Sequence, residues 1–208
     1  MGTKVFLLAT TVAAAIVLTG CSSAPPPATK AETKAAEPAK PAVAVAARSA
    51  YFEMYKAARA WAPDLLALTL KSGEVPSIKN EGGHAGVWVA VFVSPSRKEA
   101  RTFSYAVAGN GADLSKGINV SDKQTWGGAT PAAKAFANGE FSIDSDIAYK
   151  TATGPAGGWL KTHPGAKATM LLGNSSRFPG PVWYIMWGSS KDGYAVYVNA
   201  TTGDVINK

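Results

Sequence analysis

Gly180-Pro-Val-Trp-Tyr-Ile-Met-Trp187 is the stretch that decides the fold of this chain. Residues Trp183 to Trp187 would make both faces of a strand apolar. This predicts a central strand that a helix covers on at least one side. A turn signal, Lys191-Asp-Gly193, follows, because Asp-Gly tolerates the positive φ that tight hairpins need. In the next segment Tyr194, Val196 and Val198 share one face of an extended chain. Together the two segments predict an antiparallel hairpin.

The same pattern occurs earlier in the chain. Gly86-Val-Trp-Val-Ala-Val-Phe-Val93 leads, after a polar turn, into Thr102-Phe-Ser-Tyr-Ala-Val-Ala-Gly109. Trp88 and Trp183 are 95 residues apart, and a tyrosine in a helix-like stretch precedes each tryptophan by 33 or 34 residues. The agreement in order and spacing predicts a tandem repeat.

Each copy is expected to begin with a helix. The first helix is predicted from apolar residues at intervals of three and four, with Ser49 as its N-cap. The second is predicted to have Asp144 or Ser145 as its N-cap and to end near Gly154-Pro155. The apolar residues of the first helix are Tyr51, Met54, Tyr55, Ala58, Trp61 and Ala62.

A further apolar stretch lies between each helix and its tryptophan, at residues 65–70 and 168–172. Each copy therefore reads as one helix followed by three strands. The predicted fold class is α+β, made of tandem repeats in which an antiparallel sheet carries a helix on one face.

The end of the second copy carries a family resemblance. Gly193-Tyr-Ala-Val-Tyr-Val-Asn-Ala-Thr-Thr-Gly-Asp-Val205, with the tryptophan-led strand before it, resembles the end of a PepSY or PepSY-like domain. Asn199 occupies a position where the family usually has aspartate, and it keeps a turn-forming side chain. The match covers residues 142–208. Residues 48–120 share only the pattern and lack the Thr-Gly-Asp ending.

The resemblance implies small cystatin-like α+β modules, often in tandem and often secreted or membrane-anchored. It also implies a role in inhibiting or chaperoning thermolysin-type peptidases, or in regulating protease activity near the cell surface. Residues Thr201 to Asp204 are interpreted as a turn of the scaffold.

The N-terminus predicts a membrane anchor. Behind the basic Lys4, residues 5–18 form an apolar run that is short for a bilayer span, which needs about 20 residues. Leu18-Thr-Gly-Cys21 resembles a bacterial lipobox, so we expect cleavage between Gly20 and Cys21 and lipidation of the Cys21 sulfur. Two or three acyl chains on this cysteine would hold the protein on the membrane durably. Ser22 then favours the outer membrane, facing the periplasm, in a Gram-negative host.

The chain divides into five predicted segments. A proline- and alanine-rich composition without aromatic residues predicts a semi-extended tether after the lipidated cysteine, reaching about 3 Å per residue where it is polyproline-like. The segments are a signal peptide at 1–20, the lipidated cysteine and tether at 21–47, a first PepSY-like repeat at 48–121, a connector at 122–141 and a second repeat at 142–208.

Charge and cysteine content limit the partners. The formal net charge is +7, but the basic residues are scattered apart from Arg97-Lys98 and nearby Arg101, so no nucleic-acid partner is expected. The only cysteine, Cys21, is assigned to lipid, so no intramolecular disulfide is available to the folded part. Packing alone must stabilise it.

Motifs for catalysis are missing from the sequence. Gly-x-Ser-x-Gly, Ser-x-x-Lys and Gly-x-x-x-x-Gly-Lys do not occur. His84 and His163 lie in predicted loops without neighbouring ligands at zinc spacing, so we expect neither a metal nor a cofactor. An envelope hydrolase is disfavoured for this reason.

Two functional hypotheses remain. The favoured one is a non-enzymatic, membrane-anchored envelope lipoprotein that binds a protein partner, or regulates a protease, through a strand edge, a hairpin tip or an aromatic patch. The alternative is a binding module for a small molecule or cell-wall fragment, held in a hollow between helix and sheet. The candidate binding residues are Trp88, Trp183, Tyr197, Arg97 and Lys98. Core packing is the competing role for the aromatic members.

Overall fold

The computed structural model describes residues 41–111 and 113–206. The predicted signal peptide, its cleavage site at Gly20 and Cys21, the lipidation of Cys21 and most of the predicted tether lie outside these residues. Within the described part of the chain, neither helix has the length and apolar character to cross a membrane.

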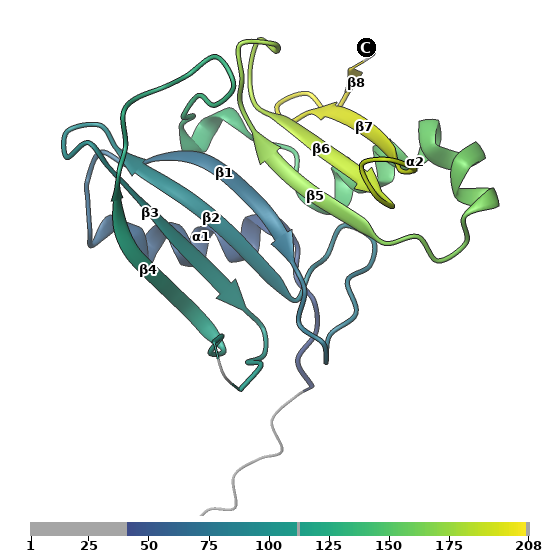
Figure 1. Cartoon of the computed structure of the whole chain (residues 1–208), viewed down its shortest axis with the longest axis horizontal. Helices are drawn as coiled ribbons and strands as arrows, with labels where there is room; N and C mark the ends of the chain where they lie inside the picture. The colour runs from purple at the N-terminus through teal and green to yellow at the C-terminus, as the bar shows by residue number, and fades with distance from the viewer. Residues whose placement is uncertain (1–40, 112, 207–208) are drawn as a thin grey trace, which may run out of the picture. The chain divides into compact units, whose positions relative to one another are not determined.

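In the described residues, eight strands form one antiparallel sheet in the order β4-β3-β2-β1-β5-β6-β7-β8 (Figure 1). The sheet is continuous because β1 and β5 pair at its centre through residues 69–71 and 171–173. The predicted α+β class is confirmed, although one shared sheet replaces a separate sheet for each repeat. The strands are β1 Leu66–Gly73, β2 Val87–Ser94, β3 Glu99–Ala106, β4 Gly117–Thr125, β5 Ala168–Gly173, β6 Val182–Trp187, β7 Tyr194–Asn199 and β8 Val205–Ile206.

Two α-helices cover one face of the sheet. The helix α1 (Ala47–Arg59) packs against β1 to β4 and places the ring of Tyr51 5.4 Å from that of Phe92 in β2. The helix α2 (Ser145–Thr162) packs against β6 and β7, after a short 3-10 helix, η1 (Asn138–Glu140). Figure 1 views the sheet from its other face, with α1 passing behind the strands.

Trp88 and Trp183 join the two halves inside the core. Both are fully buried, and their rings meet edge to face with centroids 6.2 Å apart. Each indole N–H donates to a backbone carbonyl two residues before a helix, Trp88 to Val45 and Trp183 to Ile143, both at 2.9 Å. The two tryptophans therefore hold the start of each helix against the central strands.

The two helices also share their N-terminal hydrogen bonds. Asp144 is the N-cap of α2, as predicted, and its carboxylate accepts the backbone N–H groups of Ser145 at 2.7 Å and Arg48 at 2.9 Å. The hydroxyl of Ser145 accepts the N–H of Ala47 at 2.8 Å. The prediction of Ser49 as the N-cap of α1 is wrong, because α1 begins at Ala47 and the start of α2 supplies its acceptors.

The helix α2 does not end near Gly154-Pro155, contrary to the prediction. Proline lacks the N–H of the helical ladder and costs about 3 kcal/mol inside a helix. The residues around it offset this cost by packing, since Ala152 and Ala156 are fully buried and Trp159 and Leu160 contact the core. Tertiary burial thus overrides the local signal.

Two strands were not predicted. β4 forms the edge of the sheet with exposed, mostly polar residues, and it crosses the expected boundary between residues 121 and 122. β8 adds two residues beside β7 after the turn at Thr201 to Asp204. Each half therefore contains a helix and four strands rather than three. Duplication of an ancestral unit stays a prediction.

Candidate functional site

The aromatic residues predicted as ligand contacts lie in two different environments. Trp88 and Trp183 are buried and fully hydrogen-bonded, so they line no open surface, and the expectation that they face a hollow is corrected. Helix and sheet pack directly on them. Tyr197 is half-buried on the opposite face of the sheet, because it alternates with Val196 and Val198, which enter the core.

Tyr197 belongs to a group of side chains on the helix-free face, here called the aromatic cluster: Arg177, Phe178, Tyr184 and Tyr197. The ring of Tyr197 lies 5.1 Å from that of Tyr184 and 5.2 Å from that of Phe178. The guanidinium carbon of Arg177 lies 5.1 Å from the Phe178 ring centroid and 5.2 Å from that of Tyr197. An exposed cation thus covers two of three adjoining rings.

Strand register produces this cluster. The hairpin of β6 and β7 sets Trp187 opposite Tyr194, and the same register sets Tyr184 opposite Tyr197. The pairing continues across the sheet, so that Lys71, Leu171, Tyr184, Tyr197 and Ile206 form one row. The row contains a single charged side chain, the exposed Lys71, which is a cation like Arg177.

The hydroxyl of Tyr184 remains a donor at neutral pH. Desolvation raises its pKa, and the neighbouring Tyr197 raises it further. In the structure the hydroxyl donates to the sulfur of Met186 at 3.2 Å, a weak acceptor that a partner's oxygen would replace at little cost. The cluster therefore presents apolar rings, one guanidinium and one phenolic donor.

Arg97 and Lys98 lie on the turn between β2 and β3, apart from the aromatic cluster. Both are exposed, and Lys98 adopts a left-handed backbone conformation with φ of 53°. The turn is held through Ser94, whose hydroxyl accepts the backbone N–H of Arg97 at 3.3 Å. The five predicted binding residues thus do not form one site.

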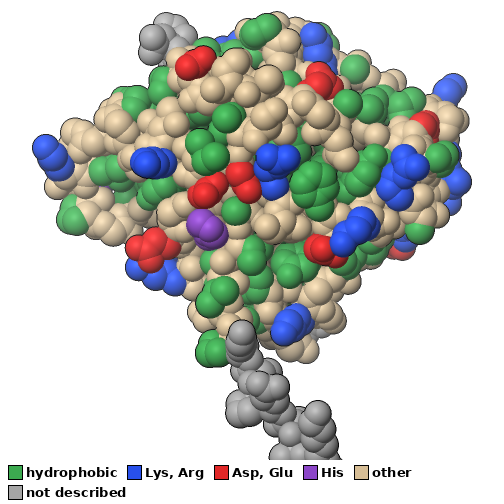
Figure 2. Space-filling model, turned by 180° about the vertical axis from the view of Figure 1, so that it is seen from behind, with side chains coloured by type: hydrophobic (Ala, Val, Ile, Leu, Met, Phe, Trp, Pro, Cys, Tyr) green, Lys and Arg blue, Asp and Glu red, His purple; other side chains and the backbone are tan. Residues whose placement is uncertain are grey.

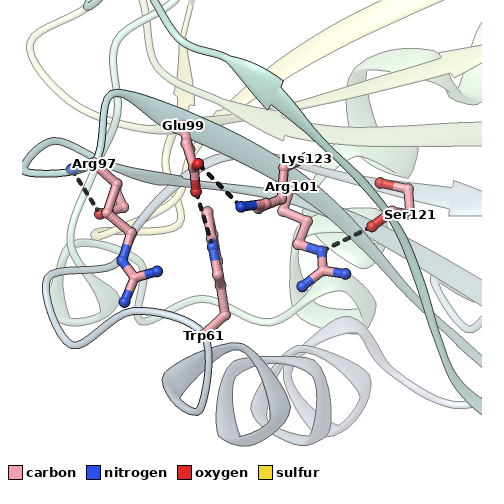
Figure 3. A network of polar contacts seen from close by, with 7 residues as sticks. Trp61, Arg97, Glu99, Arg101, Ser121 and Lys123 are labelled. Carbon is pink, nitrogen blue, oxygen red and sulfur yellow. Dashed lines mark hydrogen bonds and ion pairs between the residues drawn. The ribbon is translucent and has the colours of Figure 1, made fainter.

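Glu99 organises the polar side chains beside this turn. Figure 3 shows Trp61 and Lys123 converging on its carboxylate, the indole N–H at 3.3 Å and the ammonium at 3.3 Å. Desolvation acts to raise the pKa of Glu99, but the hydrogen bonds from Lys123 and Trp61 outweigh it and lower the pKa below its usual value. Arg101 donates separately to the carbonyl of Ser121 at 2.8 Å. These contacts fasten β3 to β4 and to the end of α1.

The charged side chains drawn in Figure 2 alternate in sign over the helix side of the molecule rather than forming one basic stripe. Within residues 41–111 and 113–206, no group of three or more His, Cys, Asp and Glu side chains is arranged to hold a metal ion. His163 instead stacks on Trp159, with ring centroids 3.9 Å apart.

Comparisons with known proteins add little. No protein-family model matches the chain, and no curated protein matches it. A crystal structure of a "putative lipoprotein" from Clostridium difficile 630 is similar over 76% of this chain and 90% of its own, with 9% identity and a TM-score of 0.42. A likeness this low carries no weight for fold or function.

Arg177, Phe178 and Tyr184 were missed from the sequence. The turn signal at Asp192-Gly193 predicted the hairpin but not its register, because a two-residue turn there would pair Lys191 with Tyr194, whereas residues 188–193 form the loop and Trp187 pairs with Tyr194. Phe178 and Arg177 lie in the loop between β5 and β6, and nothing in their local sequence indicates that this loop folds back over β7.

Proposed function

We propose that the chain is a non-enzymatic interaction module, anchored to a bacterial envelope through lipid on Cys21, that binds a protein partner across the helix-free face of its sheet. The observation that carries this proposal is the aromatic cluster. Tyrosine and arginine are the residue types that most often dominate binding energy at protein interfaces. Here they adjoin on the helix-free face of the sheet rather than in the core.

Charge and shape favour a particular kind of partner. In the row through Tyr184 and Tyr197, the apolar side chains of Leu171 and Ile206 flank the two tyrosines, Lys71 lies beyond Leu171, and Arg177 adds a second cation. A protein segment that combines apolar side chains with carboxylates complements this surface. The PepSY-like resemblance suggests a peptidase as the partner, with regulation of its activity as the outcome.

The predicted lipid anchor on Cys21 also supports a membrane location for the protein. The lipobox resemblance at Leu18 to Cys21 places the module at the membrane, and Ser22 favours the outer membrane facing the periplasm in a Gram-negative host. A Cys21→Ser chain should lose both lipid labelling and membrane fractionation. Retention on the membrane without label would overturn this part of the proposal.

The partner is tested by affinity capture from envelope extract with the full chain carrying Cys21→Ser. The informative variant combines Arg177→Ala with Tyr197→Ala, and Phe52→Ala is its matched control. Phe52 is an exposed aromatic residue on α1, 42% accessible, with Arg48 5.7 Å from its ring. It reproduces the cation–aromatic pair on the helix side of the sheet.

We expect one protein to be retained by the parent and by Phe52→Ala and lost from the double variant. Truncation of an interface hot spot costs about 2 kcal/mol or more, close to thirtyfold in affinity. Equal retention by all three chains would overturn the proposal, as would recovery of a glycan or lipid without any protein.

The alternative hypothesis, a small-molecule site between helix and sheet beside the two tryptophans, does not fit their burial. Trp88 and Trp183 are fully buried, so their side chains are not accessible to a ligand. A small-molecule site must therefore lie elsewhere in the described residues.

A further inference from the structure

A cleft of about 740 Å³ opens on the helix side of the sheet, away from the aromatic cluster. One wall is the loop of residues 74–84, and the other consists of Tyr149 and Leu160 of α2 with residues 163–170. This volume lies within the range of small-ligand sites, roughly 300–1,000 Å³. His84 and His163, which the sequence places in separate loops, both line it.

The cleft exists because the two halves of the sheet separate. β1 and β5 pair only as far as Lys71 and Leu171. At the next position the hydroxyl of Ser72 accepts the N–H of Met170 at 2.9 Å. A side-chain hydrogen bond thus replaces the backbone-to-backbone hydrogen bonds that join the two strands up to this point. Beyond it the strands diverge, and the half-buried Ala168 and the buried Met170 border the cleft.

The loop wall is held in place before any ligand arrives. The side chain of Asn80 donates to the carbonyl of Gly73 at 2.9 Å and accepts the N–H of Gly86 at 2.8 Å. Gly83 has φ of +83°, and a Cβ there would lie 2.4 Å from the carbonyl oxygen of Ser145. The loop therefore packs backbone to backbone on the start of α2, and the site is preorganised.

The lining combines an apolar floor with balanced charge at the rim. The half-buried Ile78 and Leu160 supply apolar surface. Glu74 and Lys167 face each other from the two walls at 3.6 Å, and Lys79 pairs with Glu81 at 2.9 Å. All four side chains are more than 60% exposed, so these pairs contribute little stability and exchange easily for a ligand's charges.

We propose that this cleft binds a short zwitterionic peptide of about two to four residues, a size that suits its volume. Glu74 and Lys167 separate when the peptide binds, so that Glu74 contacts the peptide ammonium and Lys167 contacts its carboxylate. Its side chains lie on Ile78 and Leu160. The site is independent of the aromatic cluster, since it lies on the other face of the sheet.

The test is a titration of the ¹⁵N-labelled full chain carrying Cys21→Ser with the tripeptide Ala-Leu-Ala, followed by NMR. The matched probe is the same tripeptide with an acetylated N-terminus and an amidated C-terminus. We expect free Ala-Leu-Ala to shift the amide signals of residues 74–84 and 163–170. The capped peptide should bind about tenfold more weakly or worse, because each charge-assisted hydrogen bond is lost.

Two variants locate the charges. Glu74→Ala and Lys167→Ala should each weaken binding of the free tripeptide about two- to fivefold, because both side chains are largely exposed. Lys161→Ala removes an exposed lysine of α2 that does not line the cleft and should leave binding unchanged. Equal binding of the capped peptide, shifts elsewhere in the molecule, or no shift at millimolar peptide would overturn the inference. None of these outcomes bears on capture through the aromatic cluster.

Discussion

Replacing Ser145 by alanine tests how the two helices are joined. The Ser145 hydroxyl accepts the N–H of Ala47 at 2.8 Å, and both residues are fully buried. Ser145→Ala leaves that N–H without a partner in a place that water does not reach, which costs about 1–3 kcal/mol. For a domain of this size, each kcal/mol lowers the melting temperature by about 2–4 °C, so we expect a loss of roughly 2–12 °C.

Thermal unfolding of the full chain carrying Cys21→Ser, followed by circular dichroism, measures this loss. Ser49→Ala is the matched control, because Ser49 is the cap that local sequence suggests, yet its side chain is exposed within the first turn of α1. It should change stability by less than about 0.5 kcal/mol. Equal stability of Ser145→Ala and its parent would refute the shared capping, as would a larger loss in Ser49→Ala.

Three further substitutions probe the scaffold. Tyr51→Phe should raise the free energy of unfolding by about 1 kcal/mol in urea denaturation, because the buried hydroxyl has no hydrogen-bond partner among the described residues; a loss of stability would contradict this. Gly83→Ala should lower the melting temperature, since the added methyl meets the Ser145 carbonyl at a positive φ, and an unchanged melting temperature would show that the loop can move. The pKa of Asp64 is lowered to about 2 by the hydroxyl of Ser94 and then by the N–H of Ser96. The stabilisation from ionised Asp64 is therefore present above about pH 4 and is lost as the pH falls toward 2. Between these pH values the melting temperature of Asp64→Asn should fall less than that of the parent. An equal fall in both proteins would exclude the effect.

The hairpin of β6 and β7 and the first helix were predictable because their signals are local. Apolar residues at 182–187 and alternating apolar residues at 194–198 indicate the two strands of the first, and spacing of three and four indicates the second. β4 escaped prediction because an edge strand is exposed and needs little apolar surface. The length of α2 escaped because burial of Ala156 and Trp159 outweighs the proline signal.

The candidate sites were harder to predict than the fold. Trp88 and Trp183 were predicted as ligand contacts, but both lie in the core. Their rings meet there because β1 pairs with β5 and joins the two halves of the sheet. The aromatic cluster depends on a loop folding over β7, and the cleft depends on where β1 and β5 separate. Both are consequences of long-range register, which a local pattern does not contain.

The central claim is that the helix-free face binds a protein, and photo-crosslinking in the native host tests it most directly. A photoreactive phenylalanine replaces Phe178 in the lipidated full chain, with Phe52 as the control position on the helix side. The account predicts one discrete protein adduct from position 178 that disappears when Arg177→Ala and Tyr197→Ala are added, and none from position 52. An adduct from position 52 alone, or no protein adduct from position 178, would contradict it.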